Sequence, residues 1–316
     1  MRIRLLVCAA LGCTAMLPAV ASANHVQCGD TLTADTTLDS DVVCTTAGAT
    51  GLVIGADNIT VTTGDFTIQG PGAADVPASI GIADDGTSHS GVTIQGHTTI
   101  TGFDTGVDLD ASSSSLQGLT VVGGSDGALM RGPDNYIYRV TADGVAFRGI
   151  EAVGDNLYLW GNIVLGTPED GIIVDGESPL IVYNTVAACV FDGLLVSGYT
   201  EGKVVRNTVS GCDIGITPSG NGILLQKNDT SQNCIGIFVD DPTALVRGNT
   251  ANQNCSEGIV TGSAGAFLRN NTTNDNADIG IDAVVGTIDG GGNTATGNGS
   301  VDCLGVICVA SAVPEV

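Results

Sequence analysis

Basic residues, aromatic residues and histidine are scarce in this chain of 316 residues. Lys and Arg total 10 against 34 Asp and Glu, so the net charge is −24, and aromatic residues make up only 4% of the sequence. Recognition of nucleic-acid phosphates needs clustered positive charge, so this composition excludes a nucleic-acid binder. The acidity favours a highly soluble surface, with Ca²⁺ binding by surface carboxylates as the alternative.

Long hydrophobic runs are also missing beyond the first 23 residues, so no membrane span is expected. Residues 1–23 themselves have the pattern of a secretory signal peptide: Arg2 and Arg4 precede an apolar stretch from Leu5 to Val20 and then small residues. A lipoprotein site at Cys13 is the alternative interpretation. The mature chain is therefore expected to be secreted to the periplasm, the cell surface or the medium.

What the sequence does contain is a repeat of about 22 residues. A glycine followed by an apolar residue recurs at steps of 21 or 22, and an asparagine recurs at steps of 21 to 23. Two independent markers with one period are a strong repeat signal. The glycines are Gly106, Gly127, Gly149, Gly171, Gly193, Gly215, Gly236, Gly258 and Gly280, and the asparagines are Asn162, Asn184, Asn207, Asn228, Asn249, Asn271 and Asn293.

The residue pattern within each repeat predicts a right-handed parallel β-helix, which is an all-β solenoid with three short strands per coil. Short β-rich runs alternate with Gly, Asn, Asp and Ser, without the 3.6-residue periodicity of helices. Coils stacked at ~4.8 Å would let each buried Asn pair with its copies above and below. The glycine is expected to supply a turn conformation. The expected organisation is an N-terminal cap at 24–50, the β-helix at 51–300 and a C-terminal cap or tail at 301–316.

Several segments resemble bacterial right-handed parallel β-helix repeat proteins, which share the pectate-lyase-like fold. They are GLVIGADNITV at 51–61, FTIQGPG at 66–72 and GVTIQG at 91–96, and the resemblance covers about residues 28 to 300. The family includes lyase-like, polygalacturonase-like and epimerase-like enzymes and binding proteins, so the resemblance implies the fold and not an activity. The histidines, His25, His89 and His97, precede the regular coils, so the histidine motifs of the family's epimerases and polygalacturonases have no counterpart.

Eight cysteines remain after signal removal, an even number that suits an oxidising compartment. Cys28 and Cys44 flank the start of the mature chain and Cys303 and Cys308 its end, which predicts disulfides at both ends. Four others follow the repeat, and residues stacked in a row cannot converge on one zinc ion. Two alternatives remain for these four. Neighbouring residues form disulfides, Cys189 with Cys212 and Cys234 with Cys255, or all four form a buried stack of reduced cysteines.

A column of aromatic and then basic residues lies just before the Asn marker. Aromatic rings can stack on sugars and cations can pair with uronate or sulfate groups, so this column predicts a polysaccharide or surface-glycan site. Outward residues without a ligand are the alternative. The column reads Tyr138, Trp160, Tyr183, Arg206, Lys227, Arg247 and Arg269.

Candidate catalytic residues are few. Asp170 and Asp192 are expected on neighbouring coils, near the spacing of a retaining carboxylate pair, although acidic turn residues that cap backbone N–H groups are the alternative. Arg206 or Lys227 would serve a lyase as base or charge neutraliser with Ca²⁺ on nearby carboxylates. No metal site and no oligomeric state are assigned. The leading hypothesis is a glycan-binding protein without a catalytic centre, the second a polysaccharide lyase or hydrolase, and the third a structural surface protein.

Overall fold

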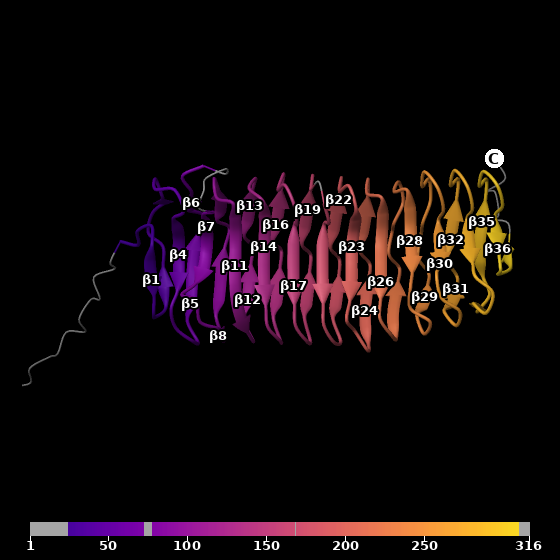
Figure 1. The fold of residues 1–316 in the computed structure, drawn as a ribbon, viewed down its shortest axis with the longest axis horizontal. Helices are drawn as coiled ribbons and strands as arrows, with labels where there is room; N and C mark the ends of the chain where they lie inside the picture. Colours follow the sequence, from indigo (N-terminus) through magenta and orange to yellow (C-terminus); the bar gives the residue numbers. More distant parts are fainter. Residues whose placement is uncertain (1–24, 73–77, 168, 310–316) are drawn as a thin grey trace, which may run out of the picture.

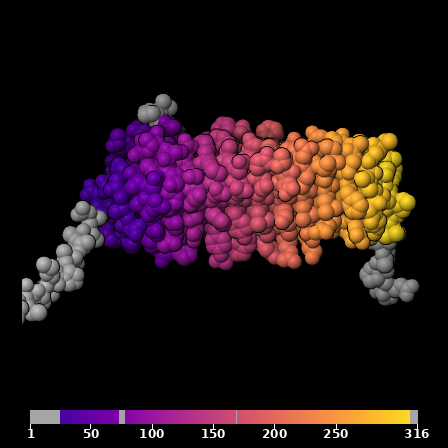
Figure 2. Space-filling model, turned by 90° about the horizontal axis from the view of Figure 1, so that it is seen from below, coloured from indigo at the N-terminus to yellow at the C-terminus, as the bar shows by residue number. Residues whose placement is uncertain are grey.

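The computed structural model describes residues 25–309 apart from 73–77 and 168. The expected signal peptide lies outside the described residues. The described chain forms a rod in which sequence position advances steadily from one end to the other (Figure 1). Its coils appear as parallel ridges in the space-filling view (Figure 2). Among the described residues, no helix is long and apolar enough to cross a membrane.

Three parallel sheets, here named A, B and C in the order in which the chain visits them, run the length of the rod. Sheet A contains β1 (Asp30–Leu32), β4 (Thr50–Ile54), β7 (Ile80–Asp84), β8 (His89–Ser90), β11 (Thr105–Ser112), β14 (Asp126–Arg131), β17 (Ile150–Val153), β20 (Ile172–Asp175), β23 (Asp192–Ser197), β26 (Ile214–Ser219), β28 (Ile235–Val239), β30 (Ile259–Thr261), β33 (Ile281–Ala283) and β36 (Cys303–Leu304).

Sheet B contains β2 (Thr36–Thr37), β5 (Thr60–Gly64), β9 (Thr93–Gly96), β12 (Ser115–Gln117), β15 (Tyr136–Tyr138), β18 (Tyr158–Trp160), β21 (Leu180–Val182), β24 (Gly202–Val205), β27 (Ile223–Gln226), β29 (Leu245–Arg247), β31 (Phe267–Arg269) and β34 (Ile288–Asp289). Sheet C contains β3 (Val42–Val43), β6 (Thr67–Gln69), β10 (Thr99–Thr101), β13 (Thr120–Val122), β16 (Thr141–Asp143), β19 (Ile163–Leu165), β22 (Thr185–Ala187) and β25 (Thr208–Ser210), and continues through isolated bridges to β32 (Thr272–Asn274), β35 (Asn293–Thr296) and β37 (Cys308–Val309).

The register confirms the predicted coil of about 22 residues. Ile150 pairs with Ile172, and Ile172 pairs with Leu194, so each strand is paired with the strand one coil away. Alternation within a strand then sends every second side chain inward, as in β20, where Ile172 and Val174 are fully buried. The core is thus one continuous column of Ile, Val and Leu, and the fold is the predicted right-handed parallel β-helix.

The periodic glycine has a different role from the expected one. Gly171 lies just before β20 and has no left-handed backbone angle. A Cβ built on it would lie 2.6 Å from the carbonyl oxygen of Gly193 in the next coil and 2.3 Å from Cγ1 of Val186. The prediction of a turn conformation was therefore wrong: this glycine is needed because neighbouring backbone and core side chains leave no room for a side chain.

The asparagine ladder is confirmed. The side-chain amide of Asn184 donates to Oδ1 of Asn207 (2.9 Å) and to the carbonyl of Leu159 (3.2 Å), while its backbone N–H also donates to Asn207 Oδ1 (2.8 Å). The same pattern repeats from Asn162 to Asn293. Each buried amide is satisfied by the coils above and below, which fixes the chain path between sheets B and C.

A second buried ladder, between sheets C and A, was not predicted: Asn233, Asn254, Asn276 and Asn298. Cys212 is in line with this ladder, since its N–H donates to Oδ1 of Asn233 (3.0 Å). Cys234 follows Asn233 by one residue, so the four repeat cysteines occupy two adjacent positions and not one column. The structure joins them as disulfides across neighbouring coils, Cys189 to Cys212 and Cys234 to Cys255, rather than as a reduced stack.

The remaining cysteines close the terminal coils. Cys28 is bonded to Cys44 in the first coil, with their Cα atoms 5.3 Å apart, and Cys303 is bonded to Cys308 in the last, with their Cα atoms 6.0 Å apart. Strands β1 to β3 already pair with the next coil, so residues 30–43 add a coil to the stack. The stack thus carries a disulfide at each end.

Candidate functional site

The seven residues expected in one column all lie on the outer surface, but they occupy two adjacent positions of the coil. One set forms the last residues of sheet B strands: Tyr138, Trp160, Arg247 and Arg269. The other set directly follows such strands: Tyr183, Arg206 and Lys227. Arg139 follows β15 in the same way and belongs with the second set, although no Asn follows it in the sequence to mark its position.

We call the aromatic and basic side chains at these two positions the strip: Tyr138, Arg139, Trp160, Tyr183, Arg206, Lys227, Arg247 and Arg269. The strip follows the corner between sheets B and C across seven coils, roughly 29 Å at ~4.8 Å per coil. Residues of the second set have left-handed backbone angles, with φ of 58° at Tyr183 and 57° at Arg206. These angles occur in the tight turn that leads into the buried Asn ladder.

Aromatic rings form the N-terminal part of the strip. The rings of Tyr138 and Trp160 are stacked, and Trp160 meets Tyr183 edge to face with centroids 6.2 Å apart. The guanidinium of Arg139 lies over both Tyr138 and Trp160, at 4.9 and 5.3 Å from their centroids. Arg206 lies over the ring of Tyr183 and donates a hydrogen bond to its hydroxyl. The result is a preformed platform of rings with cations at both ends.

Cations without a carboxylate partner distinguish this side of the rod. Arg131 on sheet A pairs with Asp108 (2.5 Å) and Asp110 (3.4 Å). Arg148, on the turn that leads into sheet A, pairs with Asp126 (2.8 Å) and Glu151. The other described basic residues all lie on sheet B or the turn after it, and within the described part of the chain none of them forms a salt bridge: Arg139, Lys203, Arg206, Lys227, Arg247 and Arg269.

A hollow of about 380 Å³ lies at the N-terminal end of the strip. Besides Tyr138 and Arg139, its wall includes Gln95, Gln117 and His97. Gln95 pairs in register with Gln117, and Gln117 with Tyr138, so the amides extend the line of the aromatic rings. These glutamines went unnoticed because they precede the first Asn of the ladder, which served as the marker.

Asp170 and Asp192 lie at a different corner, where the chain passes from sheet C into sheet A. The N–H of Asp192 donates to Oδ1 of Asp170 (2.9 Å), so Asp170 caps the neighbouring coil, as in the alternative interpretation. Asp192 accepts a hydrogen bond from the hydroxyl of Thr217 (2.5 Å). Burial raises the pKa of Asp192; the Thr217 bond lowers it, and the charges of Asp170 and Asp213 raise it further. These carboxylates and the cations Arg206 and Lys227 thus belong to two separate corners.

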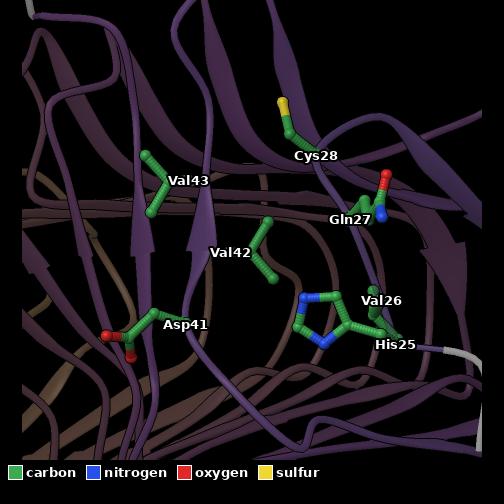
Figure 3. A pocket seen from close by; sticks show the side chains of 7 residues that line it. All are labelled: His25, Val26, Gln27, Cys28, Asp41, Val42 and Val43. Carbon is green, nitrogen blue, oxygen red and sulfur yellow. The ribbon is translucent and has the colours of Figure 1, made fainter.

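Two further features complete the survey of sites. In residues 25–309, leaving out 73–77 and 168, no three His, Cys, Asp or Glu side chains lie where they could hold a metal ion. A second hollow, of about 320 Å³, lies at the N-terminal end of the rod beside His25, Val42 and Cys28 (Figure 3). Its charged groups are engaged, because His25 pairs with Asp39 (3.0 Å) and Asp41 accepts from the N–H of Thr67 (2.8 Å).

Solved structures with the same fold include two epimerases and a bacteriophage tailspike. The periplasmic alginate epimerase AlgG is 14% identical, with a TM-score of 0.62 over 84% of this chain and 77% of that chain. The A-module of the Azotobacter vinelandii mannuronan C-5 epimerase AlgE6 is 14% identical, with a TM-score of 0.55 over 87% and 80%. A mutant tailspike protein of E. coli bacteriophage HK620 is 11% identical, with a TM-score of 0.62 over 84% and 59%.

At these identities the likeness extends to the fold alone. No curated protein sequence matches the chain. A family model described as the right-handed beta helix region matches residues 148–300, which contain nearly all of the regular Gly and Asn repeats. The match assigns residues 148–300 to this family, and the three parallel sheets in register show that the same right-handed β-helix fold extends from β1 to β37.

Proposed function

We propose that this chain is an exported β-helix protein that binds a polysaccharide or cell-surface glycan along the strip, without a catalytic centre. The observation that carries the proposal is the set of six unpaired cations on one side of a chain whose net charge is −24. Cations kept apart from 34 acidic residues are available to anionic groups of a ligand, such as uronate or sulfate.

The aromatic part of the strip supports the same ligand class. Tyr138 and Trp160 present a flat apolar surface, and the amides of Gln95 and Gln117 beside it supply donors and acceptors for hydroxyl groups. The strip also extends over seven coils, which fits an extended chain of sugars better than a small molecule. Neighbours of the same fold include alginate epimerases and a tailspike solved with a pentasaccharide, which supports a glycan ligand.

An extracytoplasmic location fits the four disulfides of the described chain. It also fits the expected signal peptide.

A second candidate function is a lyase or hydrolase that acts on an acidic polysaccharide. The raised pKa of Asp192 beside Asp170 favours it, since a raised pKa lets a carboxyl group keep its proton to a higher pH, as a general acid requires. For a hydrolase the reaction would take place at the corner between sheets C and A, away from the strip. A lyase would use Arg206 or Lys227 within the strip.

The test is binding of neutral, uronate-rich and sulfated oligosaccharides to the purified chain, with and without Ca²⁺. The informative variant is Lys227→Gln with Arg247→Gln, which removes two unpaired cations from neighbouring coils. Its matched control is Arg131→Gln with Arg148→Gln, which removes the same charge from sheet A and the turn that leads into it. We expect the first variant to weaken binding of anionic glycans at least about tenfold and the control to leave it unchanged.

Either of two results would count against the proposal: no binding to any glycan by protein shown to be folded, or equal loss in both variants. The first would favour a structural surface protein. Turnover of a bound glycan that disappears in Asp192→Asn but survives in the strip variant would establish the second candidate at the sheet A corner. Turnover lost with Arg206→Gln or Lys227→Gln would place it in the strip.

A further inference from the structure

Large apolar side chains lie exposed on sheet C and on the turn from sheet C to sheet A, in the coils between residues 120 and 191. Their exposure runs from 36% at Leu165 to 57% at Val190. In the described chain, every other exposed large hydrophobic residue is on sheet B, on the turn after it, or in the first or last coils. We call this group the patch: Val122, Phe147, Ile163, Leu165, Val190 and Phe191.

Acidic side chains are interspersed within the patch. Asp143 pairs in register with both Val122 and Leu165, so it lies directly between them on sheet C. Glu169 occupies the coil between Phe147 and Phe191, where the N–H of Phe191 points to its carbonyl oxygen. Neither carboxylate has a salt bridge or a side-chain hydrogen bond within the described residues.

An apolar surface that contains unpaired carboxylates calls for a partner that is apolar and basic. Large apolar side chains that gather in one exposed region mark interaction sites in soluble proteins. An uncharged apolar partner would bury Asp143 and Glu169 without compensation, which is costly. The complementary surface therefore needs large apolar or aromatic side chains with cations spaced among them.

This chain carries such a surface itself. The strip presents Tyr138, Trp160 and Tyr183 with the unpaired cations Arg139 and Arg206. The strip lies at the corner between sheets B and C, whereas the patch lies on sheet C and on the turn that follows it, so one molecule offers both at once. In both, side chains of successive coils are ~4.8 Å apart, so two rods lying side by side can match charge to charge over several coils.

We propose that the patch of one copy docks on the strip of a second copy. The contact is heterologous, because two different surfaces meet, and it leaves a free patch on one copy and a free strip on the other. Further copies can therefore add laterally. A patch-to-patch dimer is disfavoured, since it would bring the carboxylates of Asp143 and Glu169 together with those of the second copy. Repulsion between the acidic bodies is screened beyond about 8 Å at physiological salt.

Sedimentation velocity over a range of concentrations tests the proposal with two variants. The patch variant is Phe147→Ser with Phe191→Ser, and the strip variant is Arg206→Glu with Lys227→Glu. The altered side chains are all at least partly exposed, and circular dichroism with thermal melting verifies the fold of each variant. We expect the unmodified chain to associate and each variant alone to dissociate at least about tenfold more readily.

The equal mixture of the two variants is the decisive sample. The patch variant still has a strip and the strip variant still has a patch, so the mixture is expected to form dimers that grow no further. An unmodified chain that stays monomeric at every concentration overturns the proposal. So does a strip variant that associates by itself, because that result shows a patch-to-patch contact.

The same samples separate this inference from the proposed function. The patch variant is expected to bind glycan as the unmodified chain does, because its strip is intact. An excess of an oligosaccharide that binds the strip is expected to dissociate assemblies of the unmodified chain, because the oligosaccharide and the patch of a second copy compete for the strip. If glycan binding fails while the mixing experiment succeeds, the strip is a protein-binding surface and only the proposed function falls.

Discussion

The indole of Trp160 stacks on the ring of Tyr138, with centroids 4.6 Å apart and ring planes inclined by only 12°. Their stacking holds the outward rings of two neighbouring coils parallel to each other. Replacing Trp160 with Ala removes the larger ring and one support of the Arg139 guanidinium. We expect glycan affinity to fall about tenfold, measured by titration calorimetry.

The matched control for Trp160 is Phe238→Ala. Phe238 is also a half-buried outward aromatic residue, but it lies in β28 on sheet A. Its removal should leave glycan affinity unchanged. An equal effect of both substitutions would show that the loss is a general consequence of destabilisation.

Gly171→Ala should destabilise the rod by about 2 kcal/mol or more, because the added methyl group meets the Gly193 carbonyl and Val186 in a core that has no space to relax. Urea unfolding monitored by circular dichroism measures the change. Gly144 is the control: it has φ of 65° and no heavy atom within 4 Å of a built Cβ, so Gly144→Asn should cost less. A larger loss at Gly144 than at Gly171 would contradict this account of the repeat glycine.

Asn207→Leu should cost about 3 kcal/mol, since it leaves the carbonyl of Ile181 and the N–H of Asn184 without the bonds that Asn207 supplies. The free energy of unfolding in urea measures this cost. Asn156→Leu is the control, because Asn156 is exposed and its amide bonds only to Asp134. If both variants lose the same stability, the ladder is not what holds this corner.

His89 lies between two aspartates from neighbouring segments, with Nδ1 3.3 Å from Asp57 Oδ1 and Nε2 3.2 Å from Asp85 Oδ1. The N–H of Ser90 lowers the pKa of Asp57 most, with His89 adding to the effect, and the Thr87 hydroxyl lowers that of Asp85 most. Both carboxylates therefore stabilise the fold above the unfolded value near 3.9, and this stability is lost as pH falls through their lowered values.

A carboxyl ¹³C titration by NMR should find the midpoints of Asp57 and Asp85 below the value near 3.9 of an unperturbed aspartate side chain. His89→Ala should move both midpoints upward. Midpoints at the usual value in the unmodified chain would show that the cluster does not persist in solution.

The fold could be predicted from the sequence because stacked coils require the same residue type at the same position of each repeat. A buried amide ladder favours Asn and a crowded backbone position favours Gly, so the glycine recurs from Gly106 and the asparagine from Asn162. The physical reason for Gly171 was misjudged because crowding and a left-handed turn select the same residue. Only the register, with Gly193 one coil away, distinguishes them.

The site was harder to predict because coils differ by one residue in their turns. Trp160 is separated from Asn162 by Gly161, whereas Tyr183 directly precedes Asn184, so counting back from Asn merged two outward positions. The same ambiguity merged Cys212 with Cys234. Arg139 was not predicted because Val140 replaces the Asn of its coil. The patch was not predicted because strand alternation alone does not show which apolar residues are exposed to solvent.

The disulfides of the first and last coils, Cys28 with Cys44 and Cys303 with Cys308, bear on how such a rod comes apart. In a solenoid each coil contacts only its neighbouring coils, so the least costly route to unfolding is the loss of one coil after another from an end of the stack. A disulfide that closes each terminal coil into a covalent ring opposes the unfolding of that coil, which is the first step. The lifetime of the folded rod, and its resistance to proteases that need a loose end, should therefore depend on the redox state of its surroundings more than its equilibrium stability does.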